Sequence, residues 1–442
     1  DTDGGYLSEI KLSSLNFCYN NRMLYSKVFG KTKKGETKKF EAINQELLIK
    51  AGFIDQVASG IYNLLPLGQL VHQKIIRIIQ EELNQIGAQE ILMPSLHPKK
   101  LWEQTGRWNS VDVLFKLKSR FGSWYALGPT HEEIVTPLAK KYISSYKDLP
   151  LALYHITTKF RDEPRPKSGI LRGREFIMKD LYSFHQTKED LNKYYKMVLQ
   201  TYLKIFQRLG FKEVKITEAS GGSFSKKHSH EFNVITKSGE VDLFYCEKCQ
   251  YAQNKEIASV KEKDLCPSCN IGEMKYGRAI EIGNIFDLGT KFSQAYDLFY
   301  LDKNGRKQLV FMGCYGIGTT RILGALVELN HDSNGIIWPK TTTPYHLHLI
   351  GLDLNDKSIK EFVFNLYKNL QTDLPITVLF DDRQDLSAGE KFVDADLIGI
   401  PLRLVCSKKT KEKIEVKKRD SKETNLLNYN QLIKFISSYY HL

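Results

Sequence analysis

Two charged stretches that flank a loop rich in Pro, Gly and basic residues, at positions 160–180, constrain the fold more than any other segment. Side chains alternate between the two faces of a strand, so Arg161 and Glu163 would share one face. A returning strand would place a second row of side chains on that face. This row consists of Arg172, Arg174, Phe176, Met178, Asp180 and Tyr182. We therefore expect an antiparallel hairpin that presents arginines, carboxylates and an aromatic ring on one surface.

These residue types suit a nucleotide. Arginine binds phosphate with paired donors, Phe176 can stack on a base, and Glu163 can accept a hydrogen bond from an exocyclic amine. The alternative is a solvated charged hairpin, which is common. An aromatic ring and an Arg-x-Glu pair add little to solubility, so a nucleotide site is the preferred interpretation.

The hairpin resembles motif 2 of the class II aminoacyl-tRNA synthetases. Three segments narrow the resemblance to the bacterial-type and mitochondrial prolyl-tRNA synthetases. They are residues 128–133 (GPTHEE), 160–163 (FRDE) and 172–180 (RGREFIMKD). The resemblance runs from about Met23 to the C-terminus. It implies a homodimer that activates L-proline with ATP and Mg²⁺ and transfers the prolyl group to proline tRNA.

The charge balance agrees with a polyanionic partner. The 442 residues include 64 Lys and Arg against 51 Asp and Glu, a net charge of +13 at pH 7. Such a surplus favours nucleic acid or an anionic membrane surface. No apolar run reaches the length of a membrane span, so we expect no membrane insertion. The length allows two or three domains.

The N-terminal region, which we take as a tail over residues 1–34, is basic and polar. Residues 6–34 carry six basic side chains and one acidic side chain. This composition suits the end of an organellar transit peptide and equally a disordered basic N-terminus. The chain begins at Asp1 and not at Met, so we expect it either to start inside a longer product or to carry a remnant added for expression. We expect a mitochondrial matrix protein, with a bacterial cytoplasm or another organelle as the alternative.

Residues 66–94 have the pattern of a helix followed by a strand. Apolar residues recur at helical spacing from Val71 to Ile86, and Gly87 is a typical stop. The strand over residues 89–93 would end at Pro94. A core helix and an edge strand explain this pattern without further function. The pattern also resembles motif 1 of the class, which implies the homodimer interface.

Residues 125–133 have the pattern of a strand, a turn and the start of a helix. Thr130 and Glu133 have the spacing of a capping box. The resemblance implies a second role, in which Thr130 and Glu132 accept hydrogen bonds from the ammonium of proline. A cation that leaves water needs a carboxylate and further acceptors. His131 is interpreted as structural.

Four of the seven cysteines form two C-x-x-C pairs that are separated by 16 residues. They are Cys246, Cys249, Cys266 and Cys269. The spacing is typical of a structural Zn²⁺ site with four thiolates, within a zinc-ribbon-like insert over residues 243–275. The alternatives are four thiols that have lost their metal, or a redox pair, which the absence of a βαβ setting disfavours. Bacterial relatives often carry a large editing insertion in this interval, so we expect hydrolytic editing to be absent.

Two later segments complete the nucleotide site that the resemblance implies. Glu281 and Asn284 fall where relatives contact ATP, although relatives commonly carry histidine in place of Asn284. Residues 311–321 are rich in glycine and lead into an apolar helix, so Arg321 lies near a helix N-terminus that favours phosphate. This segment resembles motif 3. Cys314 falls where the pocket wall approaches proline, or it serves as a small buried apolar residue.

The resemblance assigns these residues to two ligands. Arg161 would hold the α-phosphate and the proline carboxylate, and Arg321 would hold the γ-phosphate, with Mg²⁺ bridging the oxygens. The amino-acid site would contain Thr130, Glu132, Arg161, Met178, Asp180, Tyr182 and Cys314. The ATP site would contain Arg161, Glu163, Arg172, Phe176, Glu281, Asn284 and Arg321.

We expect an α+β catalytic domain over residues 35–340, with an antiparallel sheet flanked by helices, and a C-terminal α/β domain over 344–442. Strands alternate with helices after residue 343. Basic residues gather at 408–422, which is usually solvated surface. The resemblance implies an anticodon-binding domain with phosphate contacts there. In that domain, residues 381–383 and 389–392 match segments that read anticodon bases.

Two other functions stay open. One is a class II synthetase for another small amino acid, such as threonine or glycine. Threonyl enzymes use a catalytic zinc with histidine ligands, and the pocket segments lack such a set. The other is a non-catalytic paralogue that binds nucleic acid. Such paralogues usually lose a motif arginine, whereas Arg161 and Arg321 are both present.

Overall fold

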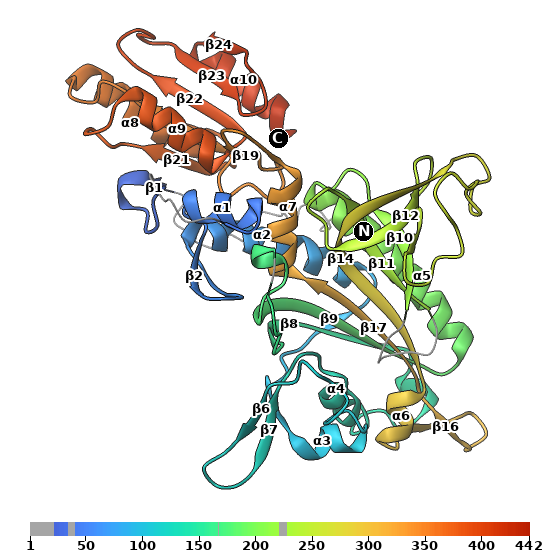
Figure 1. Cartoon of the computed structure of the whole chain (residues 1–442). Helices are drawn as coiled ribbons and strands as arrows, with labels where there is room; N and C mark the ends of the chain where they lie inside the picture. Colours follow the sequence, from blue (N-terminus) through green and yellow to red (C-terminus); the bar gives the residue numbers. More distant parts are fainter. Residues whose placement is uncertain (1–21, 34–39, 167, 221–227) are drawn as a thin grey trace, which may run out of the picture. The chain divides into compact units, whose positions relative to one another are not determined.

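The structure is a computed structural model that describes residues 22–33, 40–166, 168–220 and 228–442 (Figure 1). The chain divides into two compact units. Of the described residues, the larger unit contains those from 30 to 344 with 396–399, and the smaller contains 22–29, 345–395 and 400–442. Within the described residues, no helix is both long enough and apolar enough to cross a membrane.

A nine-stranded sheet forms the centre of the larger unit. Its spatial order is β11-β10-β13-β12-β14-β17-β9-β8-β4, and β11 also pairs with β14. Neighbouring strands are antiparallel except for β10 with β13 and β8 with β4. The strands are β4 Gln89–Glu90, β8 Leu151–Phe160, β9 Glu175–His185, β10 Lys215–Ser220, β11 His228–Ile235, β12 Val241–Cys246, β13 Tyr251–Asn254, β14 Met274–Gly289 and β17 Phe311–Gly318. The expected antiparallel sheet is confirmed.

Three long helices lie together against this sheet. Helices α5 (Lys188–Leu209) and α7 (Thr319–Leu329) contact β9, β14 and β17, and α2 (Pro66–Gln85) packs against both helices. The α2 helix begins with proline in its first turn and is followed by Gly87 at φ 74°, as the sequence predicts. The following strand is shorter than expected, because only β4 pairs with β8 and Pro94 lies four residues beyond it.

The hairpin of β8 and β9 has the predicted pairing, with Leu151 opposite Phe184 and Phe160 opposite Glu175. Its strands are shorter than predicted, so Arg161 and Glu163 follow β8, and Arg172 precedes β9. One backbone hydrogen bond from Arg161 N to Arg174 O, at 2.8 Å, extends the ladder past the strand ends. Arg161 and Arg172 therefore lie on the connecting loop, beyond the ends of the two strands.

Short elements surround the sheet. The α4 helix begins at Glu132 with His131 as its N-cap and without a side-chain cap, so the predicted capping box is wrong. Thr130 and Glu133 find other partners, which are described with the site. The remaining elements of this unit are α1 Ile43–Lys50, β2 Ile54–Ala58, β3 Ile61–Leu64, β5 Leu96–Pro98, α3 Lys99–Gln104, β6 Lys116–Lys118, β7 Trp124–Leu127, α4 Glu132–Ala139, α6 Lys291–Ala295, β15 Phe299–Leu301, β16 Lys307–Leu309, β18 His331–Asp332 and β19 Gly335–Ile336.

The smaller unit is a mixed sheet in the order β1-β21-β20-β22-β23-β24, with helices packed on it. Its alternation of strands and helices agrees with the sequence prediction. Two strands were missed: β1, whose residues were assigned to the tail, pairs with β21, and β24 pairs with β23. The elements are β1 Arg22–Leu24, β20 Leu347–Gly351, α8 Lys357–Asp373, β21 Val378–Asp381, α9 Ala388–Ile398, β22 Leu402–Cys406, β23 Ile414–Lys418, β24 Thr424–Leu427 and α10 Tyr429–Tyr440.

Candidate active site

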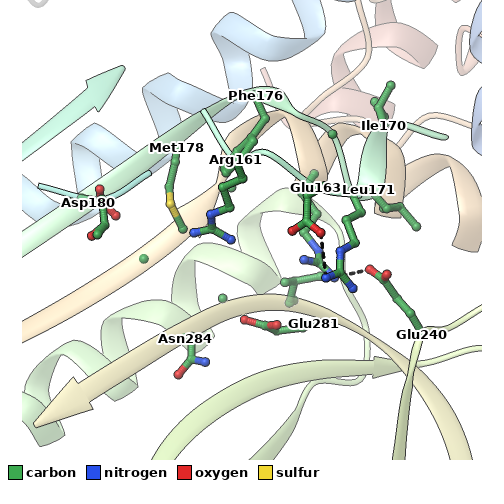
Figure 2. Close-up of a pocket in the computed structure, with 18 of the residues that line it drawn as sticks. Arg161, Glu163, Ile170, Leu171, Phe176, Met178, Asp180, Glu240, Glu281 and Asn284 are labelled. Carbon is green, nitrogen blue, oxygen red and sulfur yellow. Dashed lines mark hydrogen bonds and ion pairs between the residues drawn. The ribbon is translucent and has the colours of Figure 1, made fainter. Parts of the chain in front are cut away.

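A cavity of 370 Å³ lies in the larger unit, where β9, β14 and β17 meet the loop between β8 and β9 (Figure 2). In Figure 2, Met178 and Asp180 lie at one end of the cavity and Glu163 and Glu240 lie at the other. Arg161 lies between the two pairs. All but two of the predicted ligand-binding residues line this cavity. They are Thr130, Arg161, Glu163, Arg172, Phe176, Met178, Asp180, Glu281, Asn284, Cys314 and Arg321. Segments far apart in the sequence therefore form one site.

The two exceptions, Glu132 and Tyr182, are buried behind Thr130. Thr130 Oγ1 donates a hydrogen bond to Glu132 Oε2 at 2.6 Å, and the Tyr182 hydroxyl accepts one from His131 N at 2.9 Å. Among the described residues, Glu132 Oε1 is buried without a hydrogen-bond partner. A buried carboxylate oxygen in this state can accept from a cationic ligand that reaches it.

Arg161 lies at the centre of the cavity wall. Its guanidinium carbon is 5.0 Å from the centroid of the Phe176 ring, a cation–π arrangement. Burial lowers the pKa of Arg161, whereas the carboxylates of Asp180, Glu281 and Glu163 raise it. One face of Phe176 is thus occupied by the guanidinium, and a stacked base would use the other.

The second predicted arginine, Arg321, lies in the first turn of α7 and is ion-paired with Glu240. On the same side of the cavity, Arg172 Nη2 is 3.0 Å from Glu163 Oε2. The charges of both arginines are therefore balanced by carboxylates that would compete with a phosphate. Glu240 was not predicted, because it precedes β12 in a turn without a recognisable motif.

The β14 strand supplies Glu281 and Asn284 to the opposite wall. Asn284 pairs with Glu231 of β11. Burial and, to a smaller extent, the nearby Glu281 carboxylate together raise the pKa of Glu231 to about 8. Two carboxylates that repel each other in this way are suited to bind a divalent cation, which relieves the repulsion.

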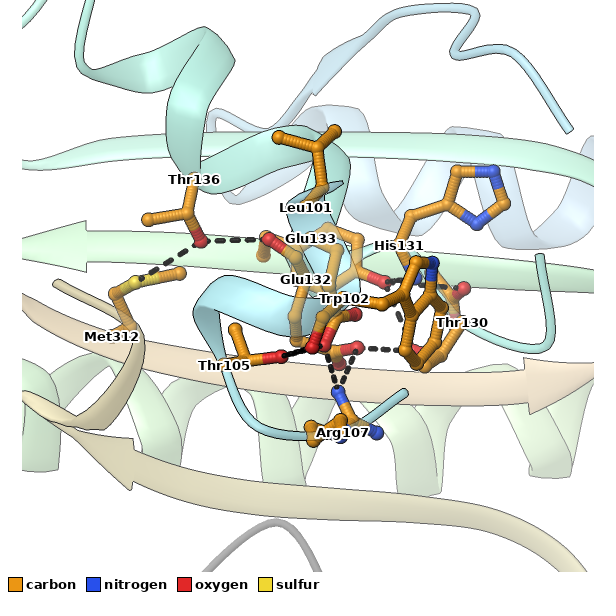
Figure 3. Close-up of polar contacts among 12 residues, drawn as sticks. Leu101, Trp102, Thr105, Arg107, Thr130, His131, Glu132, Glu133, Thr136 and Met312 are labelled. Carbon is orange, nitrogen blue, oxygen red and sulfur yellow. Dashed lines mark hydrogen bonds and ion pairs between the residues drawn. The ribbon is translucent and has the colours of Figure 1, made fainter. Parts of the chain in front are cut away.

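A buried ionic cluster supports the start of α4 (Figure 3). Arg107 Nη1 is 2.8 Å from Glu133 Oε1 and 3.7 Å from Glu132 Oε2, and Thr105 Oγ1 donates to Glu133 Oε1 at 3.1 Å. Burial raises the pKa of Glu133 to about 7. Glu133 thus forms an ion pair with Arg107 and does not cap the helix. Arg107 lies on the loop after α3 and was not predicted.

The four predicted metal ligands also come together. Cys246 Sγ is 3.7 Å from Cys269 Sγ, Cys249 Sγ is 3.7 Å from Cys266 Sγ, and all four sulfurs lie within 4.8 Å of one another. Four thiolates at about 2.3 Å from a tetrahedral zinc would lie about 3.8 Å apart, so the set fits this metal. The segment is continuous with the main sheet, since Cys246 of β12 pairs with Met274 of β14.

In the smaller unit, a cavity of 580 Å³ lies between the ends of β20, β21 and β22 and the start of α9. Lys409 and Arg383 are among its lining residues. Arg383 Nη2 is 2.7 Å from Asp381 Oδ2 and 2.9 Å from Asp394 Oδ2, so this predicted contact residue is held by two carboxylates. The side chains of Lys408, Lys409, Lys411, Lys413, Lys418 and Lys422 are exposed.

Two family models match the chain, and they confirm the expected synthetase fold with a C-terminal anticodon-binding domain. Residues 115–330 match the tRNA synthetase class II core domain (G, H, P, S and T), and residues 346–439 match the anticodon binding domain.

Curated relatives and solved structures resemble nearly the whole chain. A proline–tRNA ligase of Sulfurihydrogenibium sp. is 34% identical over 95% of this chain and 100% of the relative, and one of Bacillus pumilus is 33% identical over 90% and 96%. The first alignment spans 567 residues, so that relative carries segments that this chain lacks. The structure of Giardia lamblia prolyl-tRNA synthetase in complex with prolyl-adenylate has a TM-score of 0.74 at 22% identity, covering 90% of this chain and 78% of that one.

Proposed function

The chain belongs to the proline–tRNA ligase family of class II synthetases, and we propose that it ligates L-proline to proline tRNA in two ATP-dependent steps. One observation carries the proposal. A single cavity contains Arg161 and Arg321 for phosphate and Thr130 in front of the buried Glu132 for an ammonium. ATP and proline would therefore bind side by side.

In the first step, the proline carboxylate attacks the α-phosphorus of ATP, which gives prolyl-adenylate and pyrophosphate. In the second, the terminal ribose hydroxyl of the tRNA attacks the carbonyl carbon, and AMP leaves. No protein nucleophile is required, because positioning and charge stabilisation suffice for this chemistry. Arg161 would hold the α-phosphate and the proline carboxylate, and Arg321 the γ-phosphate after it leaves Glu240.

The other lining residues take roles that fit their chemistry. Phe176 would stack on adenine, and Glu163 would accept from the adenine amine after it releases Arg172. Glu281, with Glu231 behind it, would provide oxygen ligands for Mg²⁺ on the phosphates. The proline ammonium would bind Thr130 and Glu132, while Met178, Asp180 and Cys314 would form the pocket wall.

The test is amino-acid-dependent exchange of pyrophosphate with ATP, run with each of the twenty amino acids and with Arg161→Ala. We expect proline to drive exchange and the variant to lose it while keeping its fold. Arg165→Ala is the matched control, because this exposed arginine lies on the same loop outside the cavity. Exchange at the wild-type rate in folded Arg161→Ala, or exchange driven by threonine or glycine, would contradict the assignment. A non-catalytic paralogue would show no exchange at all.

We also propose that the four cysteines bind a structural Zn²⁺. Besides the sulfur separations, backbone N–H groups point at three of the sulfurs, from Lys248 N to Cys246 at 3.3 Å, Tyr251 N to Cys249 at 3.5 Å and Gly272 N to Cys269 at 3.5 Å. Such donors stabilise thiolates. All four positions are protein ligands, so the metal would hold the fold together without binding substrate.

Further proposals concern assembly and location. A homodimer through α2 and β4 is supported by Leu92, which is apolar and 83% exposed beside the edge strand β4. The exposed lysines of the smaller unit and its cavity support anticodon binding by residues 344–442. The compact four-cysteine segment supports the absence of editing, which hydrolysis assays with alanyl-tRNA would test. The basic composition of residues 6–34, of which 6–21 and 34 lie outside the described residues, supports mitochondrial location, with a bacterial cytoplasm or another organelle as the alternative.

A further inference from the structure

A lysine is buried beneath the loop that carries Thr130 and Glu132. Lys159 Nζ lies 2.8 Å from His131 Nδ1 and 2.6 Å from His155 Nε2. It also lies 2.9 Å from Asp180 Oδ2. His155 is directly opposite Asp180 in the hairpin of β8 and β9, so both side chains and that of Lys159 share the face that lines the cavity. No part of Lys159 is exposed to solvent.

The groups around Lys159 Nζ suit an ammonium, because Asp180 carries a negative charge and both histidines can accept a hydrogen bond. His131 Nε2 is 3.1 Å from Pro94 O, and a carbonyl oxygen only accepts, so Nε2 carries the ring hydrogen and Nδ1 is an acceptor. An ammonium has three N–H donors, and His131, His155 and Asp180 can each accept one. Burial lowers the pKa of Lys159, but the Asp180 carboxylate opposes that change.

The three acceptors form a set that is typical of a metal site, so the expectation that the pocket lacks a set of histidine ligands is wrong. Two histidines and one carboxylate with ligand atoms within 4.8 Å of one another are suited to a divalent transition metal. Here the Lys159 ammonium lies within hydrogen-bond distance of all three atoms. A lysine of the chain itself therefore supplies the positive charge that a bound metal ion would supply at this position.

We propose that Lys159 is a positioning residue for proline, whose ammonium holds the His131 ring and orients the Asp180 carboxylate at the pocket wall. His131 lies between Thr130 and Glu132, and its ring is held at one nitrogen by Lys159 and at the other by Pro94. A fixed His131 ring keeps the two flanking side chains in place to receive the proline ammonium. This inference rests on the proposed function and adds that Lys159 governs proline affinity more than ATP affinity.

The main test replaces Lys159 with methionine. This change keeps an unbranched side chain of similar length but removes the charge and all three donors. In proline-dependent exchange, we expect the KM for proline to rise at least about tenfold while the KM for ATP stays within about twofold. The matched control is Lys179→Met. Lys179 is equally buried but points to the other face of β9, where its Nζ is 2.9 Å from Tyr315 O. We expect that variant to lose stability without a change in the KM for proline.

A second pair of variants keeps the test decisive if Lys159→Met does not fold. His155→Leu removes one acceptor of the ammonium, whereas His155→Gln replaces it with an amide that can still accept. We expect the leucine variant to raise the KM for proline and the glutamine variant to restore it. An unchanged KM for proline in folded Lys159→Met or His155→Leu, or an equal rise in the KM for ATP, would overturn the inference. Failure of the proposed function differs from this outcome, because then the wild-type protein itself would show no exchange with proline.

Discussion

Arg321 and Glu240 form an ion pair inside the cavity, although 81 positions separate them in the sequence. Both side chains are largely shielded from water, and both line the space in which we place the phosphates. The arginine is thus held by a carboxylate that occupies part of the phosphate site. Binding of ATP would exchange one anion for another, so the charge of Arg321 is balanced before and after.

We expect a weaker ion pair between Arg321 and Glu240 to favour the binding of ATP. Glu240→Gln removes the competing negative charge, and we expect the KM for ATP to fall about threefold to fivefold, the effect of roughly 1 kcal/mol. Pyrophosphate exchange at varied ATP concentration measures the change. Asp242→Asn, two residues further on, is the control, because Asp242 binds the Tyr276 hydroxyl at 2.7 Å outside the cavity. An increased KM for ATP in Glu240→Gln would show instead that Glu240 holds Arg321 in its active position.

Stability should depend on pH through Glu133. Burial raises its pKa from the ordinary value of 4.5 to about 7, so between these values the folded protein binds a proton that the unfolded chain has lost. The free energy of unfolding should therefore fall as the pH rises through this window and become level above it. We expect Glu133→Gln to reduce the total fall in the free energy of unfolding across this pH window by about 1–2 kcal/mol, measured by urea unfolding.

The control for Glu133 is Glu103→Gln. Glu103 lies in α3 on the surface, 2.9 Å from Lys99. This variant should retain the wild-type dependence on pH. An equally steep slope in Glu133→Gln would assign the effect to another group.

The exposed Leu92 beside the edge strand β4 predicts that the chain forms a dimer. If Leu92 is covered by a second copy of the chain, Leu92→Asp places a charge in an apolar contact, and sedimentation velocity should show a shift from dimer to monomer. Leu426→Asp is the control, since this exposed leucine lies on β24 of the smaller unit. A wild-type protein that is monomeric at micromolar concentration would refute the predicted dimer.

The cysteine cluster predicts a stable bound metal. Purified protein should contain about one zinc per chain, and both chelation and Cys246→Ser should lower the melting temperature. Cys406→Ser, which changes a buried cysteine of the smaller unit, should leave the zinc content unchanged. Absence of zinc together with unchanged melting after chelation would exclude the site.

The sequence predicted elements well where a local pattern determines them. After residue 343, the predicted alternation of strands and helices is observed, for example in α9 (Ala388–Ile398), because apolar periodicity and turn residues act over a few positions. The β24 strand was missed, since Thr424–Leu427 is short and mostly exposed and its strand character comes from pairing with β23. The capping box at Thr130 failed for a related reason, because the distant Arg107 competes for Glu133.

In the candidate site too, residues in local motifs were predicted, and residues that depend on long-range contacts were not. Motifs located the arginines that line the cavity and all of its carboxylates except Glu240, because each motif is continuous in the sequence. Lys159, Arg107 and Glu240 were not found, although each has a charged group within the site or directly behind it. A charged side chain is expected at the surface until a long-range partner is known, and only the folded chain supplies that partner.

The β14 strand connects the four-cysteine segment of the larger unit with its cavity. Met274 at its start faces Cys246, and Glu281 and Asn284 further along form a wall of the cavity. If the four cysteines hold the proposed zinc, its loss would release the cysteine end of this continuous strand, and we expect the affinity for the nucleotide to fall more than the affinity for the amino acid. Protein synthesis would in this way respond to the supply of a trace element through an enzyme whose chemistry does not use it.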